Sequence, residues 1–471
     1  MRSALRVGLP GLALVLLMLG LAPQPISQPL ALDFVRAQTA RAANDSVLEA
    51  DLLSDAAARL FYDGDLALRA GLAQLAAGFY DSAIRSIQRS AALDGWTPAK
   101  QVALGEAYFG QGDLAQAIAQ WEQARSLLPA DPGLLTRLAA AYDALGRPAE
   151  AAAVRAELAA LQPTSVEAQY RLGLYRAATE PGSAVLPLSA VASLAPEAAS
   201  KAQLVLDAIA LGQASGDEAY LFGRVGLALV QLEEWSLAEI ALEQAVALNS
   251  TYADAYAYLG LAQDMLGTDG QTNLEAAVKL APDSVLANYM LALHWRRLGQ
   301  SAQALPYLQA AQKLDPQNPA LAAEMGGAFA AMGDLAQAEA WFTQAVSLAP
   351  DDAQFWLLLT RFYIDSEFHI AEPGLAAARE TWRRLPEDSL AVEAYGYALL
   401  LTGDIAGAGV LLEKAAQLGP QEPSVFYHLG ALYAAQSRWP EAAAAYKHAL
   451  ALDPNGLYGS RALRALATLP N

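Results

Sequence analysis

Histidines and carboxylates are the side chains of this sequence that could hold a metal ion or move a proton. The four histidines, His294, His369, His428 and His448, include no pair with metal-ligand spacing on one helix. Asp and Glu total 49, so paired carboxylates are expected by chance. No glycine-rich phosphate loop, nucleophile elbow or calcium loop occurs, and cysteine is absent. We therefore predict no catalytic residue, no cofactor and no metal.

Prolines return at nearly constant intervals along the chain. The intervals are 34 and 33 residues in a first series and 34, 34, 36, 34 and 34 in a second, the prolines being Pro129, Pro163 and Pro196, then Pro282, Pro316, Pro350, Pro386, Pro420 and Pro454. A period of this size indicates a solenoid of two-helix repeats. One repeat cannot bury its own apolar faces, so neighbouring repeats must stack.

Each repeat places the same residue types at fixed positions, counted here from 1 to 34 with the proline at 32. In residues 98–131, Gly105 stands at position 8 and Trp121 at position 24, and residues 319–352 and 423–456 follow the same pattern. Apolar positions 4, 7, 8 and 11 share one face of a first helix, and positions 20, 24, 27 and 28 share one face of a second. Small residues at 8 and 20 let the two helices approach closely.

This pattern resembles the tetratricopeptide repeat family. The resemblance implies an all-α, right-handed superhelical solenoid, and about eleven helix-turn-helix repeats can be placed between residues 64 and 456. The pattern is poorest in residues 166–198 and in residues 353–388, where two residues are inserted near 370–374.

The domain organisation follows from the repeats and from what remains outside them. We expect a signal peptide or N-terminal membrane anchor at 1–22, a spacer with capping helices at 23–63, a first array at 64–198, an extra helix and linker at 199–218, a second array at 219–456, and a C-terminal capping helix at 457–471. Ser250 occupies the proline position that follows Pro196, and the interval between them exceeds one repeat by 20 residues. The apolar residues of this surplus have helical spacing, so we expect an extra helix there. An odd helix breaks the pairing, so a kink is expected there.

The first 22 residues are typical of a targeting segment. Arg2 and Arg6 precede an uncharged apolar stretch, residues 7–22. Its length is short of the roughly 20 residues that span a bilayer, which favours a cleaved signal, whereas Pro23 directly after the best small-residue site is unfavourable for cleavage. A cleaved signal and a retained anchor both place the repeats outside the cytoplasm. The alternative is a short buried helix packed on the first repeats.

The chain is strongly acidic, with 30 basic residues, 49 acidic residues and a net charge of −19. This charge disfavours nucleic acid and anionic membrane surfaces as partners, because both are themselves negative. It serves either as a solvated coat for solubility or to steer a basic partner. We expect a protein or peptide partner, and membrane contact only through the N-terminal segment.

The resemblance also implies where a partner binds. In proteins of this family the first helices line the inside of the superhelix, and positions 2, 5, 9, 12 and 13 face the partner. The predicted partner-binding residues are therefore Tyr220, Leu227, Gln231, Leu261, Asp264, Tyr289, Leu293, Arg296, Arg297, Arg361, Tyr397 and Tyr427. Aromatic and Arg side chains suit this role because they supply binding hot spots. The alternative is that the apolar members pack against adjacent turns and that the arginines pair with neighbouring helices.

Two functions remain open at this point. The first is a non-catalytic interaction scaffold that binds a peptide or protein in the concave groove outside the cytoplasm. The second is a structural or assembly component of a cell-envelope complex, such as one that secretes protein or exports polysaccharide. That component would also use the convex face and the terminal repeats.

Overall fold

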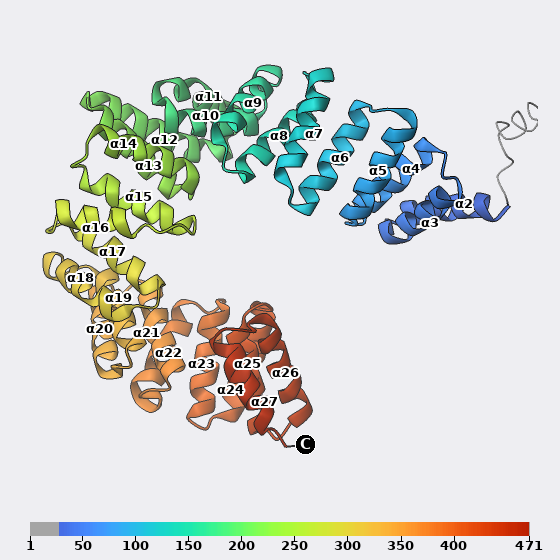
Figure 1. Ribbon diagram of the computed structural model, residues 1–471. Coiled ribbons are helices and arrows are strands. Elements are labelled where there is room, and N and C mark those ends of the chain that lie inside the picture. Colours follow the sequence, from blue (N-terminus) through green and yellow to red (C-terminus); the bar gives the residue numbers. More distant parts are fainter. Residues whose placement is uncertain (1–27, 471) are drawn as a thin grey trace, which may run out of the picture. The chain divides into compact units, whose positions relative to one another are not determined.

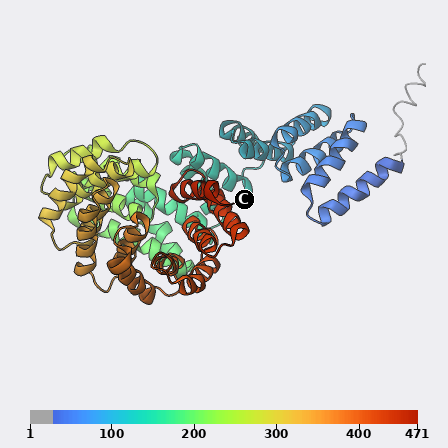
Figure 2. The ribbon, with the colours of Figure 1, turned by 90° about the horizontal axis from the view of Figure 1, so that it is seen from below.

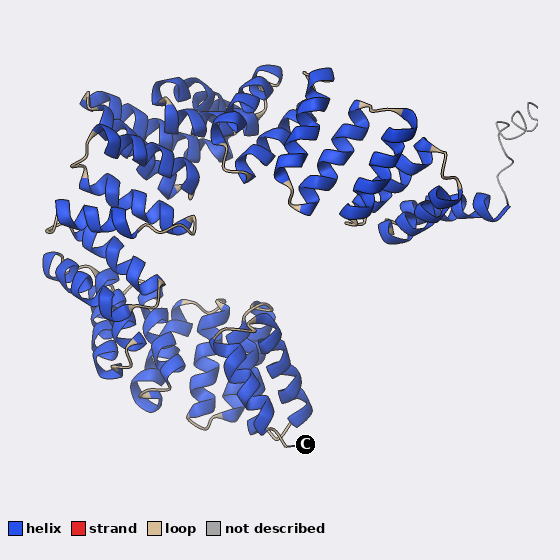
Figure 3. Cartoon of the chain, in the orientation of Figure 1, coloured by secondary structure: helices blue, strands red, loops and turns tan. Residues whose placement is uncertain are grey.

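The computed structural model describes residues 28–470, so the predicted targeting segment at 1–22 lies outside the described residues. The described part contains 26 α-helices, α2 to α27, one short π-helical segment and no strand (Figure 1, Figure 3). Consecutive helices pair as helix hairpins, and eleven such pairs lie between residues 64 and 456. The predicted all-α solenoid of two-helix repeats is confirmed.

The chain forms two compact units, residues 1–207 and 208–471, and their boundary falls inside helix α12. The helices of the first unit are α2 (Gln28–Ala42), α3 (Ser46–Arg59), α4 (Gly64–Ala76), α5 (Tyr80–Asp94), α6 (Pro98–Gln111), α7 (Leu114–Leu127), α8 (Pro132–Ala144), α9 (Pro148–Leu161), α10 (Val166–Thr179) and α11 (Pro181–Leu194). Helix α12 (Pro196–Ser215) lies in sequence between the pair α10–α11 and the pair α13–α14.

The second unit contains seven helix pairs and a final single helix. They are α13 (Glu218–Gln231), α14 (Trp235–Leu248), α15 (Ala253–Met265), α16 (Gln271–Leu280), α17 (Val285–Arg297), α18 (Ser301–Leu314), α19 (Pro319–Ala331), α20 (Leu335–Leu348), α21 (Ala353–Ser366), η1 (Ile370–Gly374), α22 (Leu375–Arg384), α23 (Ser389–Leu401), α24 (Ile405–Leu418), α25 (Pro423–Ala435), α26 (Trp439–Leu452) and α27 (Leu457–Thr468). Figure 2 shows the yellow to red helices of this unit following one another along a curved path.

In many of the pairs, close packing comes from one small residue at position 8 and one large residue at position 24. A Cβ atom added to Gly105 would lie 2.4 Å from Nε1 of Trp121, and one added to Gly326 would lie 2.9 Å from the ring of Phe342. Trp121 is 1% exposed, and its indole nitrogen donates a hydrogen bond to the carbonyl of Val102 at 3.1 Å. Positions 8 and 24 therefore determine how closely the two helices of a repeat approach.

In every repeat except residues 166–198, the turn between the paired helices has a left-handed residue at position 15. Gly112 and Gly333 have φ values of 89° and 81°, as glycine readily does. Glu233 and Ser437 adopt φ of 60° at the same position in their repeats. Where the next residue is aspartate, as at Asp113, Asp334 and Asp404, its side chain caps the second helix; Asp113 accepts the amide of Gln116 at 3.1 Å.

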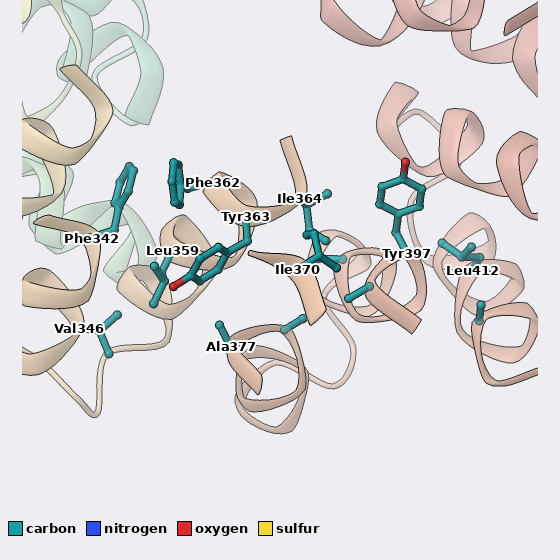
Figure 4. Close-up of a cluster of buried hydrophobic side chains, with 14 of the residues drawn as sticks. Phe342, Val346, Leu359, Phe362, Tyr363, Ile364, Ile370, Ala377, Tyr397 and Leu412 are labelled. Carbon is teal, nitrogen blue, oxygen red and sulfur yellow. The ribbon is translucent and has the colours of Figure 1, made fainter. Parts of the chain in front are cut away.

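The least regular repeat, residues 353–388, absorbs its two inserted residues as the π-helical segment η1. Thr360 replaces the glycine at position 8, and its hydroxyl lies 2.7 Å from that of Thr381 on the second helix. Around this repeat, a buried apolar cluster joins side chains from α20 to α25, including Phe342, Tyr363 and Leu412 (Figure 4). The insertion is therefore accommodated without loss of a continuous core.

Within residues 28–470, no helix combines the length and the apolar character needed to cross a membrane.

Candidate functional site

The first helices of successive repeats in the second unit lie side by side. Helix α13 contacts α15, α15 contacts α17, and the series continues from α19 through α21, α23 and α25 to α27. Side chains at position 12 bridge consecutive first helices, since Asp264 on α15 pairs with α17, and Arg296 on α17 pairs with Glu324 on α19. Equivalent positions of these helices therefore belong to one continuous face.

Three leucines occupy position 9 on three adjacent first helices of this face. They are Leu227 on α13, Leu261 on α15 and Leu293 on α17, and each is partly exposed. We call these three residues the leucine strip. Tyr220 and Tyr289 are also partly exposed on α13 and α17, and burial raises the pKa of the Tyr289 hydroxyl. The strip is an apolar surface that the repeats place in register.

The two adjacent arginines of α17 pair with carboxylates of neighbouring first helices on opposite sides. Arg297 pairs with Asp264 of α15, and Arg296 pairs with Glu324 of α19, lying across Gly327. Burial lowers the pKa of Arg296. Both arginines therefore form ion pairs with neighbouring helices, which is the alternative that the sequence analysis left open.

Asp264 is the centre of a polar cluster at the same end of these helices. It accepts hydrogen bonds from the backbone amide of Gly270 at 3.0 Å and contacts Nδ1 of His294 at 2.9 Å. Asp269 brings a third potential metal ligand to within 4.8 Å. The sequence did not reveal this group because His294 belongs to the repeat that follows the one containing Asp264 and Asp269. The guanidinium of Arg297 on Asp264 already supplies a positive charge there.

A second polar cluster crosses the first helices near the C-terminus. The carboxylate of Glu393 on α23 accepts from Nη1 of Arg361 on α21 at 2.8 Å and is paired with Nδ1 of His428 on α25. Both Glu393 and His428 are fully buried. Burial alone would raise the pKa of Glu393, but His428 and Arg361 outweigh it and hold that pKa below its usual value.

The last helix, α27, reaches across this cluster to a helix three repeats earlier. Nη2 of Arg361 donates to the hydroxyl of Tyr458 at 2.6 Å, and that hydroxyl is also hydrogen-bonded to Asp365. Arg461 donates to the backbone carbonyl of Asp365 at 2.6 Å. Tyr427 packs beside Tyr458, with ring centroids 5.8 Å apart. The predicted binding residues Arg361 and Tyr427 are thus engaged by the chain's own C-terminal helix.

Tyr397 and Gln231 mark two extremes among the predicted binding residues. Tyr397 is only 4% exposed, stacks on His428 at 3.6 Å between ring centroids, and donates its hydroxyl to Glu367 at 3.2 Å. The prediction that Tyr397 faces a partner does not fit this arrangement, because the inserted turn at 367–374 and α25 cover it. Gln231, at the end of α13, is exposed.

Regular helix pairs, an apolar strip along adjacent first helices and a stacked core define a class of repeat protein that presents an extended surface. Three family models, all described as tetratricopeptide repeat, match the sequence: one at residues 296–362, one at 102–166, 267–319 and 365–423, and one at 423–455. Together these matches cover more than half of the chain. The chain belongs to the tetratricopeptide repeat family.

Solved structures with a similar fold include several repeat proteins. Yeast Tom70 is 16% identical, with a TM-score of 0.38, and the match covers 86% of this chain and 95% of that one. The Cut9–Hcn1 hetero-tetramer of the APC/C gives 12% identity and a TM-score of 0.41, covering 93% and 96%. A tetratricopeptide repeat protein from Parabacteroides merdae gives 15% and 0.43, covering 53% and 98%. No curated protein matches the sequence.

Membership of this family gives the general role of the chain. Tetratricopeptide repeats bind proteins or peptides, so the chain is a protein–protein interaction scaffold, and proteins of this kind are typically non-enzymatic.

Proposed function

We propose that this protein is a non-catalytic scaffold outside the cytoplasm that binds a peptide or protein segment along the first helices of residues 219–318. The observation that carries the proposal is the leucine strip. Leu227, Leu261 and Leu293 occupy one repeat position on adjacent helices and stay partly exposed. An extended or helical segment with apolar side chains at regular spacing would cover such a strip.

Paired charged residues border the leucine strip on its polar edge. Arg296, Arg297 and Asp264 are held by ion pairs within the chain, so the partner meets a fixed edge of paired charges rather than free ones. Such edges contribute more to register and specificity than to affinity. Nucleic acid remains an unfavourable partner at a net charge of −19.

The location outside the cytoplasm rests on the sequence. Arg2 and Arg6 ahead of the apolar stretch at 7–22 orient a signal or anchor so that the repeats follow it across the membrane.

The test compares capture of envelope proteins by the full-length chain and two variants. Leu261→Asp places a charge in the strip, and Leu248→Asp is its control because Leu248 is 51% exposed at the end of the second helix α14. We expect Leu248→Asp to bind the same proteins as the wild type does. We expect the affinity of Leu261→Asp for these proteins to fall by about tenfold or more, as for the loss of a hot spot. Circular dichroism confirms that both variants fold.

The opposite pattern would overturn the proposal. If Leu261→Asp bound normally and Leu248→Asp did not, contact would run along the edge formed by second helices. The assembly-component function would then replace the groove-binding one.

A further inference from the structure

One repeat of the first unit departs from the pattern at its central position. In residues 132–165, position 24 is Arg155, whereas Trp121, Phe342 and Tyr446 fill it in three other repeats and are at most 7% exposed. The guanidinium of Arg155 forms a two-pronged ion pair with Asp143, with Nη1 at 3.0 Å from Oδ1. The large apolar side chain that fills this position in these repeats, and as Ile87, Leu242, Leu308 or Leu412 in others, is therefore replaced by a paired guanidinium.

A pocket of about 520 Å³ lies beside Arg155, between α8, α9 and the start of α10. In the preceding repeat, Trp121 contacts positions 5, 8 and 12, through the carbonyl of Val102, the close approach of Gly105 and the ring of Phe109. The same three positions in this repeat, Thr136, Ala139 and Asp143, line the pocket together with Arg155.

The lining of the pocket combines apolar, polar and charged side chains. Ala139, Ala140, Leu158 and Ala168 are the apolar residues of the lining, and Gln162, Ser165, Glu167 and Arg171 add polar and charged side chains. None of the described residues that line it is aromatic. Ala140 stands at position 9, the position of the leucine strip in the second unit, so the pocket opens on the equivalent face of its own repeat.

We propose that this pocket receives an aromatic side chain, tyrosine in particular, from a bound polypeptide, with its ring stacked on the guanidinium of Arg155. An arginine whose edge is held by a carboxylate leaves its planar face available for stacking on a ring. The chain uses the same contact elsewhere, with Arg147 4.9 Å from the ring of Tyr142 and Arg438 4.2 Å from that of Tyr433. A tyrosine hydroxyl would find hydrogen-bond partners among the polar residues of the lining. The inference rests on the proposed function only in taking the ring to come from a polypeptide.

The test follows the side-chain Nε–H signal of Arg155 by NMR in the full-length protein labelled with ¹⁵N-arginine. The signal is identified by its disappearance in Arg155→Lys. The probes are N-acetyl-tyrosinamide, N-acetyl-leucinamide and acetate. We expect N-acetyl-tyrosinamide to move this signal upfield in a saturable way, because the ring shields a proton above its face, and the other two probes to leave it nearly unchanged.

Two variants separate the pocket from general surface binding. Ala140→Leu narrows the pocket at an exposed position and should abolish the response, whereas Ala431→Leu, the same repeat position on α25, should preserve it. An unmoved Arg155 signal, equal shifts with leucinamide or acetate, or an unchanged response in Ala140→Leu would each overturn the inference. Because no partner is used, these results are independent of whether the leucine strip binds one.

Discussion

At the scale of single residues, the geometry of the repeat depends on a few positions. The glycine at position 8 faces the large residue at position 24, as in Gly430, where an added Cβ would lie 2.7 Å from Tyr446. Position 15 takes a left-handed conformation with glycine, glutamate or serine in ten of the eleven repeats, the exception being Glu180 with φ of −143°. The sequence reveals these positions because their residue types recur.

Ser437 occupies the left-handed position without the freedom of glycine. Its φ of 60° disfavours a residue with a Cβ atom by roughly 1–2 kcal/mol, and the greater unfolded-state entropy of glycine offsets part of the gain. We expect Ser437→Gly to stabilise the last repeat by about 1 kcal/mol in urea unfolding, with Ser437→Ala giving no gain. A destabilised glycine variant would show that this turn does not limit stability.

Glu393 is the most consequential buried charge of the second unit. We expect Glu393→Ala to destabilise by about 3–5 kcal/mol, since it leaves Arg361 and His428 beside an empty position. The folded pKa of Glu393 lies below the unfolded value of about 4.3, so its carboxylate contributes stability at neutral pH that is lost as pH falls through the folded pKa.

The free energy of unfolding, measured between pH 7 and pH 3, checks both the loss of stability in Glu393→Ala and the pH dependence due to Glu393. The wild type should lose more stability on acidification than Glu393→Ala. Glu413→Ala, at an exposed position of α24, is the control and should behave as the wild type does. A wild-type acid dependence that survived in Glu393→Ala would rule out this assignment of the buried charge.

Side-chain partners across repeats were beyond prediction for a physical reason. Arg297 meets Asp264 33 residues earlier, and Arg361 meets Glu393 32 residues later. These distances depend on the register in which repeats stack, which residue type and spacing along one helix do not define. The sequence could therefore propose that Arg297 faces a partner, while the structure gives it an internal carboxylate.

At the scale of elements, the helix pairs follow the periodic sequence closely, and the departures occur where the period changes. The two-residue insertion becomes the π-helical segment η1, and the surplus after Pro196 becomes α12. The reach of α27 to α21 could not be foreseen, because it joins residues 97 positions apart and depends on the curvature of the array.

Tyr458 is the side chain through which α27 holds α21. Tyr458→Phe removes the hydroxyl that binds both Arg361 and Asp365 while keeping the ring. We expect faster amide hydrogen exchange in α21 and α27, and a loss of about 1–3 kcal/mol, because buried polar groups lose a partner. Tyr433→Phe on α25 is the matched control. Unchanged exchange in α21 would mean that α27 is held by its contacts with α25 and α26 alone.

At the scale of the whole molecule, each unit is a stacked array whose core continues from repeat to repeat. The helices among residues 28–470 stack as repeats, and proteins of this family are typically non-enzymatic scaffolds. What the whole molecule does depends on where it resides and on what its first helices meet.

The location can be measured directly. With the repeats outside the cytoplasm, protease added to intact spheroplasts should digest them, while a cytoplasmic marker protein stays intact. Full protection that disappears only on lysis would place the repeats inside the cell and contradict the role of Arg2 and Arg6 proposed above.

The central claim is that a partner covers the leucine strip, and a hydrogen-exchange footprint tests it most directly. Amide exchange is measured for the full-length protein alone and in complex with a partner. The partner is the captured protein that Leu248→Asp still binds and Leu261→Asp does not. If the two variants do not differ, the most abundant captured protein is used. We predict slower exchange on binding in α13, α15 and α17, where Leu227, Leu261 and Leu293 lie. Slower exchange confined to second helices such as α14, α16 and α18 would contradict the claim.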